Sequence, residues 1–587
     1  MNKILLSPNS DKSKDTTLEL FRSLNSIHSN ENLKSEIEFE KGEYHFYSDF
    51  CREEFFYVSN NFDSLKRSPA LMSDFDHLTI EGNGSEFIYH GEITPFIIDN
   101  CRHIELKNFS IDWERPFYSQ GTVCETHEDS IVIKISPDYP YRVKGDKLLF
   151  LGEGYEEELV DGIFEMDPRT KAPAYLSGDG CGSGFIKTEF IKFDSISEGI
   201  VRIHYPFNKR PTVGNELILR HYKRNCPGIF IKNSSNVLLN NVHVHHAGAM
   251  GVIAQFTENI KLDNCSVSPK KGSNRLFSTT VDATHFVSCK GVVELKNCLF
   301  ENQLDDPANI HGIYTRIKEK LDPKTLILEL VHSEQKGVEI GFSGDSVQFV
   351  NPKTFQSVSK NEMESLHFLN KDFAVVSFKN EIADSVDIGF VMENTTWIPN
   401  LIIHGCTARN NRARGFLITT RGKVLIENNH VSASGAAIKI SGDTNNWFES
   451  GPVREILIQN NYFHDCNYGP WGKAVIIIDP EIEKKYRSEH YFHKNITIRD
   501  NVFDTFENAI LYGFSIDGFC FEGNEIKKNE NYKAVHNDRP VIDLSHSKNI
   551  RIEDNIFHES TLNNIFKTEE LKNADLQSVS SDLMLPQ

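Results

Sequence analysis

The sequence lacks long apolar runs and has few basic residues. Of its 587 residues 39% are hydrophobic, and no apolar segment approaches the roughly 20 residues that a membrane helix needs. Lys and Arg number 63 against 83 Asp and Glu, a formal net charge of −20. A nucleic-acid backbone selects the opposite charge, so we expect neither a membrane span nor a nucleic-acid partner. The acidic balance suits a neutral ligand, although solubility alone also explains it and is the favoured explanation.

Paired cysteine motifs are also absent. The eleven cysteines are odd in number and show neither Cys-x-x-Cys pairs nor the spacing of zinc ligands, which predicts reduced thiols. The segment before Ser7 and Pro8 holds too few apolar residues for a signal-peptide core. As it stands the sequence predicts a cytoplasmic protein, or a periplasmic or secreted one if a signal has been removed.

A short repeat dominates what is present. An apolar–x–apolar pattern followed closely by Asn, Asp or Gly recurs along the chain, and several starts lie 23 residues apart, such as Val237 and Ile260. The starts are Leu78, Ile104, Val237, Ile260, Val293, Leu401, Val424, Ile456, Ile496, Phe519 and Ile550. Alternation predicts strands with one buried face, and the following polar residue predicts a tight bend.

Short strands at this period bury their apolar faces only by stacking on neighbouring coils. We therefore predict an all-β chain, a right-handed parallel β-helix. A leucine-rich repeat would need a consensus that is absent here, and a propeller would need about 40 residues per unit. Cys265, Cys298 and Cys406 occupy the same position of the repeat, so we expect them to stack inside the coils.

Two intervals interrupt the repeat with longer alternating runs, which predict inserted antiparallel β-barrels or sandwiches. A helix beginning at Thr16 or Thr17, with Leu20, Leu24 and Ile27 on one face, should cap the open end. The predicted divisions are 1–114 (cap and first coils), 115–222 (first insert), 223–314 (coils with the candidate aspartates), 315–395 (second insert) and 396–587 (last coils and tail).

Three aspartates are separated by one coil. Asp282 precedes Asp305 by 23 residues and Asp306 by 24, so we expect the three carboxylates in one cluster, about 4.8 Å apart per coil. Such close carboxylates repel one another, and at least one should hold a proton at neutral pH. An acid beside a base is what glycoside hydrolysis requires. The alternative is a set of bend residues or a cation site.

Other polar residues are predicted to lie at the same height and to bind substrate. His285 and His311 follow the aspartates, and Arg414 precedes a strand of a later coil. Trp447 and Glu449 share a polar loop, and an aromatic plate with a charged acceptor is a usual sugar-binding pair. Burial of Trp447 against an insert is the alternative.

The segments Val281-Asp-Ala-Thr-His-Phe-Val-Ser-Cys289 and Asp305-Asp-Pro-Ala-Asn-Ile-His-Gly312 resemble the bacterial α-1,3-galactosidases of glycoside hydrolase family 110. The likeness covers most of the chain. It implies an exo-acting, inverting enzyme without metal or other cofactor that removes terminal α-1,3-linked galactose from glycans of the blood group B or linear type. By analogy with other β-helix hydrolases, Asp305 resembles the general acid, and Asp282 and Asp306 resemble the pair that activates water.

The sequence departs from the polygalacturonases in lacking their Gly-His-Gly and Arg-x-Lys signatures, which argues against pectin as substrate. Two rival functions remain. One is a non-catalytic glycan-binding β-helix, and the other is a β-helix hydrolase or lyase for another polysaccharide. A homodimer is left open.

Overall fold

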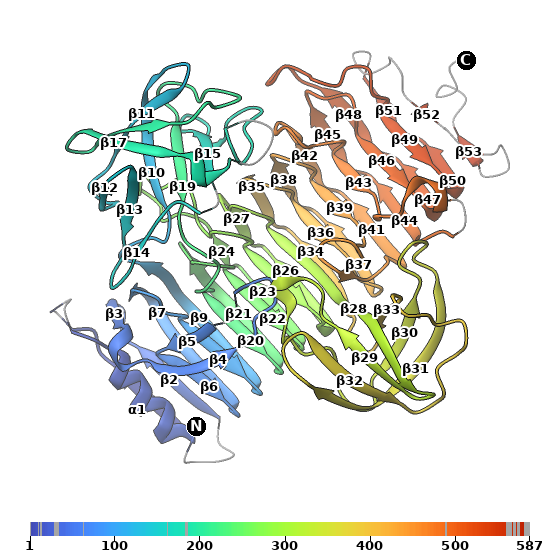
Figure 1. The fold of residues 1–587 in the computed structure, drawn as a ribbon, viewed down its shortest axis with the longest axis horizontal. Helices are drawn as coiled ribbons and strands as arrows, with labels where there is room; N and C mark the ends of the chain where they lie inside the picture. The colour runs from blue at the N-terminus through green and yellow to red at the C-terminus, as the bar shows by residue number, and fades with distance from the viewer. Residues whose placement is uncertain are drawn as a thin grey trace.

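The structure, a computed structural model, describes residues 2–9, 11, 14–28, 34–62, 64–160, 162–181, 186–487, 490–558, 566–567, 571 and 576–579. Stacked coils run from the N-terminal to the C-terminal end as one right-handed parallel β-helix, and two β-domains project from it (Figure 1). One domain lies at the upper left of the view and the other, coloured olive, at the lower right. The predicted fold class is confirmed.

Each complete coil adds a strand to each of three parallel sheets, which we call sheets 1, 2 and 3. Sheet 1 comprises β6 (Ala70–Ser73), β8 (Phe96–Asp99), β20 (Ile229–Lys232), β22 (Val252–Gln255), β25 (Thr284–Val287), the start of β28 (Ala308–Asp322), β36 (Phe416–Ile418), β39 (Ile438–Ile440), β43 (Ile476–Ile478), β46 (Leu511–Phe514), β49 (Ile542–Ser545) and β52 (Phe566–Lys567).

Sheet 2 comprises β1 (Asn2–Leu6), β2 (Ser35–Phe39), β7 (Asp76–His90), β9 (Arg102–Trp113), β21 (Ser235–Val244), β23 (Glu258–Asp263), β26 (Lys290–Lys296), β34 (Pro399–His404), β37 (Lys423–Glu427), β41 (Glu455–Gln459), β44 (His493–Arg499), β47 (Ile516–Glu522), β50 (Lys548–Glu553) and β53 (Leu576–Val579). Sheet 3 joins β3 (Glu43–Tyr47) and the ends of β7, β9 and β21 to β24 (Ser266–Val267), β27 (Leu299–Glu301), β35 (Thr407–Asn411), β38 (His430–Ala433), β42 (Tyr462–His464), β45 (Val502–Thr505), β48 (Glu525–Lys528) and β51 (Ile556–Phe557).

The predicted repeat starts lie in a single line along sheet 2. Leu78 pairs with Ile104, which pairs with Val237, and the pairing continues through every start to Ile550. Val293 pairs with Leu401 even though the second insert separates them in the sequence. A one-residue slip would turn every apolar side chain outward, so burial fixes this register.

The bend between sheets 2 and 3 carries an internal ladder of stacked side chains. Cys265, Cys298 and Cys406 are buried as predicted, and the Cys298 N–H donates to Cys406 Sγ (3.4 Å). In the following coils Asn replaces Cys, beginning with Asn429, whose Oδ1 accepts from the Cys406 N–H (2.8 Å). Asparagines just before the ladder, such as Asn297 with a φ of 53°, adopt the left-handed conformation that the bend requires.

At the N-terminal end α1 (Thr17–His28) buries Leu20, Leu24 and Ile27 in the core of the first coils, which confirms the predicted cap. No helix among the described residues has the length and the apolar character needed to cross a bilayer.

In addition to a three-stranded antiparallel sheet of β12 (Tyr141–Lys144), β13 (Lys147–Leu151) and β14 (Glu156–Glu157), the first insert has a seven-stranded antiparallel sheet; the second insert is a closed barrel. The seven-stranded sheet has the order β16 (Ala172–Pro173), β15 (Gly162–Asp167), β19 (Glu216–Arg220), β10 (Ser119–Thr126), β11 (Ser130–Ile135), β18 (Ile200–His204) and β17 (Lys192–Ser197). In the barrel, the outer part of β28 joins β29 (Thr325–Glu329), β32 (Phe373–Phe378), β31 (Ser357–Phe368), β30 (Ser346–Val350) and β33 (Val391–Asn394). β28 starts in sheet 1 and enters the barrel without a break, so the helix and the second insert share one strand.

Candidate active site

A cavity of about 450 Å³ lies over the outward side chains of sheet 1. Two rows of residues from successive coils form much of its lining. One row holds Met250, Asp282, Asp306 and Arg414, each located two residues before a strand of sheet 1. The other row is His285, Asn309, Leu417 and Lys439, which pair in register across four strands. The volume falls within the range of small-molecule sites.

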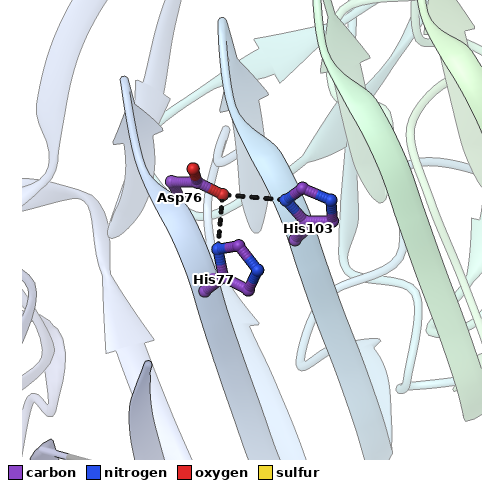
Figure 2. Close-up of side chains that lie close together, drawn as sticks. All are labelled: Asp76, His77 and His103. Carbon is purple, nitrogen blue, oxygen red and sulfur yellow. Dashed lines mark hydrogen bonds and ion pairs between the residues drawn. The ribbon is translucent and has the colours of Figure 1, made fainter. Parts of the chain in front are cut away.

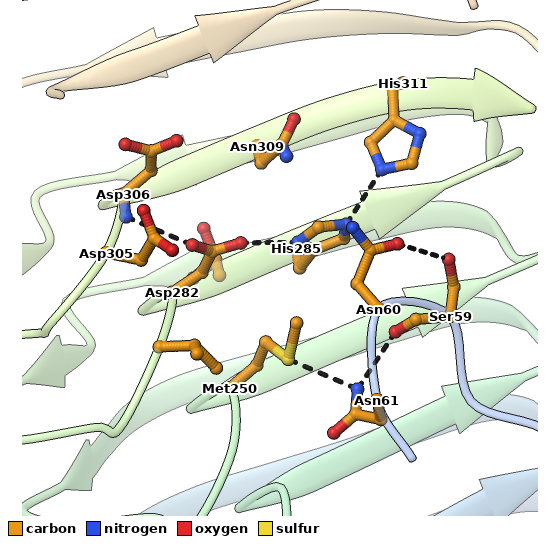
Figure 3. Close-up of polar contacts among 12 residues, drawn as sticks. Ser59, Asn60, Asn61, Met250, Asp282, His285, Asp305, Asp306, Asn309 and His311 are labelled. Carbon is orange, nitrogen blue, oxygen red and sulfur yellow. Dashed lines mark hydrogen bonds and ion pairs between the residues drawn. The ribbon is translucent and has the colours of Figure 1, made fainter. Parts of the chain in front are cut away.

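The three predicted aspartates come together in this cavity. Carboxylate oxygens of Asp282, Asp305 and Asp306 lie within 4.8 Å of one another (Figure 3). Asp305 and Asp306 are located in the bend before β28, where consecutive side chains can face the same space. The Asp305 side chain is 21% exposed, whereas Asp306 is almost fully buried. Asp305 is therefore the carboxylate most open to a ligand.

Arg414 binds Asp306 directly. Its backbone N–H and its Nε donate to Asp306 Oδ1 (2.9 and 3.0 Å), and its Nη2 donates to Oδ2 (2.6 Å). Burial raises the pKa of Asp306 to about 7, although the charge of Arg414 opposes that rise. The sequence predicted a sugar contact for Arg414; in the structure its strongest contacts are with an aspartate of the cluster.

Asp282 starts a chain of buried hydrogen bonds. Its Oδ2 lies 2.5 Å from His285 Nδ1, His285 Nε2 lies 2.8 Å from His311 Nε2, and His311 Nδ1 lies 2.8 Å from the Gly312 carbonyl oxygen. A carbonyl only accepts, so His311 donates to Gly312. With both imidazoles neutral, His285 then donates to His311, and Asp282 donates to His285. The chain thus places a proton on Asp282.

The local electrostatics agree with that direction. Burial lowers the pKa of His285 to about 4 and also lowers the pKa of His311. Burial, together with the negative charge of Asp305, raises the pKa of Asp282 well above its usual range. A neutral pair of histidines beside a protonated Asp282 agrees with the lowered pKa of His285, the lowered pKa of His311 and the raised pKa of Asp282.

Glu449 and Trp447 both line the cavity. Glu449 belongs to β40 (Glu449–Ser450), which pairs antiparallel with β28, and its Oε1 accepts from Asn309 Nδ2 (3.3 Å). Trp447 is 38% exposed, and the His332 ring of the second insert packs against it with the planes tilted by 33° and the centroids 4.4 Å apart. An exposed ring in a polar cavity offers a plate for a sugar.

His311 lies behind the wall of the cavity. It is not among the residues that line the cavity, and its side chain is fully buried behind His285 and β40. In the structure it contacts His285, and its predicted contact with a sugar stays a prediction.

Comparison with known proteins places these features in a family. Family models described as GLAA-B beta-barrel domain I and GLAA-B beta-barrel domain II match residues 119–217 and 325–391. The chain is 36% identical over 524 residues to the alpha-1,3-galactosidase A of Shewanella woodyi, covering 88% of this chain and 84% of that protein. It is 36% identical over 556 residues to the alpha-1,3-galactosidase B of Bacteroides thetaiotaomicron, covering 92% and 89%. The chain belongs to the α-1,3-galactosidase family.

Membership in the α-1,3-galactosidase family confirms the resemblance predicted from the sequence, and it makes the chain a glycoside hydrolase. The two matched models fall inside the two inserts, so the inserts are a feature of this family. Their predicted boundaries, 115–222 and 315–395, remain predictions.

In this galactosidase both inserts support the cavity, which sequence reasoning missed. Asp179 of the first insert binds Arg412, and Glu334 of the second accepts from Arg224 (Nη1 to Oε2, 3.0 Å). Arg412, Arg224 and a second exposed tryptophan, Trp471, line the cavity. The partners are far apart in the sequence and share no motif, so no local signal predicts them.

A second cluster of ligand-type atoms lies on the outer surface. Asp76 Oδ1 accepts from His77 Nδ1 (2.7 Å) and from His103 Nδ1 (2.9 Å), and all three side chains are exposed (Figure 2). Both histidines have a positive φ and occupy the bend position that Asn236 takes in the next coil. Hydrogen bonding at a bend accounts for this cluster, which lies outside the cavity.

Proposed function

We propose that the protein removes terminal α-1,3-linked galactose from glycans, acting from the chain end with inversion at the anomeric carbon. The observation that carries this proposal is the cluster of three carboxylates from neighbouring coils, set in the cavity of a chain that belongs to the α-1,3-galactosidase family. Glycans of the blood group B or linear type are the proposed substrates.

The proposed roles follow from exposure and partners. Asp305, the most open carboxylate, donates a proton to the departing glycosidic oxygen. Asp282 and Asp306 hold a water molecule that attacks the anomeric carbon from the opposite face, and Asp306, bound by Arg414, takes the proton that the water loses. In this scheme Asp305 enters the reaction with a proton of its own, and the proton that Asp306 takes from the water replaces it afterwards. The bond to the leaving oxygen breaks as the bond to water forms.

One observation favours retention as a second candidate. Inverting enzymes usually separate their two carboxylates by about 6.5–9.5 Å, and retaining enzymes by about 5–5.5 Å. The carboxylate oxygens here lie within 4.8 Å of one another, which suits direct attack by an aspartate. We prefer inversion because the sequence pattern, Asp282 followed one coil later by the adjacent Asp305 and Asp306, resembles that of β-helix hydrolases in which water is the nucleophile.

Proton NMR of the first sugar released from Gal-α-1,3-Gal separates these candidates. Early β-galactose supports inversion, and early α-galactose establishes retention with the same substrate. If the intact protein releases no galactose from this disaccharide or from blood group B trisaccharide, the proposed substrate is wrong.

A further inference from the structure

Asp179 is a buried carboxylate of the first insert that reaches the wall of the cavity. It follows β16 in the chain, next to Gly180, which bridges to Ile163 of β15, and it is 5% exposed. Its Oδ1 accepts from Arg412 Nε (2.5 Å), and its Oδ2 accepts from Arg412 Nη2. Its Oδ1 also accepts from Nη1 of Arg220, at the end of β19 (3.3 Å). Both arginines line the cavity, whereas Asp179 does not.

The charge balance shows that Asp179 is ionised. Burial alone raises the pKa of a carboxyl, but the positive charges of Arg412 and Arg220 keep the pKa of Asp179 below its ordinary value. The two-point contact with Arg412 fixes the plane of that guanidinium, as bidentate arginine–carboxylate pairs do. Asp179 therefore sets both the charge and the orientation of Arg412.

Arg412 in turn contacts the proposed catalytic machinery. Its Nη1 lies 3.8 Å from Asp305 Oδ1 and donates to the Leu304 carbonyl (3.4 Å). The guanidinium lies over the Trp471 ring, 5.4 Å from its centroid. One side chain thus connects the proposed acid with an exposed aromatic surface of the cavity.

We infer that Asp179 is a positioning residue, by which the first insert fixes Arg412 between Asp305 and Trp471 and becomes part of the active site. The inference rests on the proposed function, because it takes Asp305 as the general acid. Without Asp179, Arg412 would have Asp305 as its nearest remaining carboxylate. An unneutralised guanidinium favours the ionised form of Asp305, which cannot donate a proton.

Asp305 faces other charged or titratable groups, and these stay constant in the test. They are Asp282, Asp306, His285, Arg224 and Arg414, besides Arg412 itself.

Asp179→Asn keeps the shape of the side chain and removes its charge. We expect kcat on Gal-α-1,3-Gal to fall at least tenfold, with a smaller change in KM. The high-pH limb of the kcat profile should move to lower pH. Arg412→Gln should move the same limb to higher pH, because Asp305 then loses a nearby cation. Asp179→Glu keeps the negative charge, so its high-pH limb should lie at the same pH as that of the wild-type enzyme.

Asp194→Asn is the matched control. Asp194 belongs to the same insert and bonds His204 Nε2 (2.7 Å), but its side chain is 66% exposed and is not among those lining the cavity. We expect it to leave kcat and the pH profile unchanged. The inference is overturned if Asp179→Asn folds and matches this control.

A double variant covers the case in which Asp179→Asn fails to fold. The double variant with Asp179→Asn and Arg412→Gln removes one charge of each sign, so it should fold. Its kcat and the position of its high-pH limb should equal those of Arg412→Gln alone. A further fall in kcat of tenfold or more beyond Arg412→Gln would show that Asp179 acts by another route, against the inference. Wild-type inactivity on the disaccharide would reject the proposed function, and the inference with it. An active wild type with unaffected Asp179 variants rejects the inference alone.

Discussion

The carboxyl group of Asp282 and the imidazole of His285 lie 2.5 Å apart, in a hydrogen-bond chain that ends on the Gly312 carbonyl. This relationship gives one aspartate of the cluster a partner that its two neighbours lack. Asp306 is bound instead by Arg414, and Asp305 lies about equally far from two arginines, at 3.7 and 3.8 Å. The three aspartates thus have three different environments, which gives each carboxyl group a different tendency to hold a proton and therefore a different role.

Replacing His285 tests the chain. His285→Phe keeps a ring of similar size but removes the acceptor for the Asp282 proton, leaving the buried Oδ2 hydroxyl of Asp282 without this partner, while Oδ1 still accepts from the Asp306 N–H. We expect kcat to fall about 10- to 100-fold, since an unsatisfied buried polar group costs about 1–3 kcal/mol. KM should change little. His430→Phe, on sheet 3, is the control. Equal kcat values for the two variants would show that the hydrogen-bond chain from Asp282 to Gly312 does not matter for turnover.

Replacing Asp305 tests the proposed acid. Asp305→Asn should lower kcat on Gal-α-1,3-Gal by about 10²–10⁴-fold, the usual contribution of acid catalysis. The loss should be far smaller on 4-nitrophenyl α-galactoside, whose leaving group departs without a proton. Circular dichroism should match the wild-type enzyme, as should that of the control Asp263→Asn on sheet 2. Equal losses on both substrates would assign Asp305 another role.

The pH dependence follows from Asp306. Its pKa is raised to about 7, and a base works only when ionised, so kcat should fall as the pH drops below about 7. Arg414→Met removes the charge that favours the ionised form, and the low-pH limb should therefore move to higher pH. A limb that stays in place in this variant would mean that another group is titrating. Arg409→Met, which removes an exposed ion pair with Glu301, is the control.

The repeat made most of the fold predictable. Alternation with a period of two fixes which face is buried, so Leu78, Ile104 and Val237 could be aligned from the sequence alone. The same logic placed Asp282 beside Asp306, since both precede paired strands by two residues. Features that repeat once per coil can be predicted because each coil carries the same short sequence pattern.

Contacts across the repeat were not predictable. Asp179 and Arg412 are 233 residues apart, and nothing near either residue indicates its partner. His311 is covered by β40, a strand that returns from a much later part of the chain, so its burial could not be foreseen. These contacts depend on how the inserts and loops fold back over sheet 1.

The internal asparagine ladder carries a prediction about stability. Asn461 Nδ2 donates to the Ile426 carbonyl (2.9 Å) and to Asn501 Oδ1 (2.9 Å), while its Oδ1 accepts from the Asn429 N–H (3.0 Å). Leu at this position has nearly the same volume but cannot make these bonds, so two backbone groups of the preceding coil, the Ile426 carbonyl and the Asn429 N–H, lose these partners. We expect Asn461→Leu to lower the free energy of unfolding by several kcal/mol, about 1–3 for each buried group left unpaired.

Asn461→Leu should lower the stability of the coils and leave the catalytic reaction unaffected. Asn461 lies in the bend between sheets 2 and 3, away from the residues that line the cavity, so kcat of the folded fraction should be close to that of the wild-type enzyme. Denaturant unfolding followed by circular dichroism measures the loss, with Asn274→Ala, at an exposed position, as the control. An unfolding midpoint equal to that of the control would show that water or a shifted backbone satisfies these groups, and that the ladder does not hold the coils together.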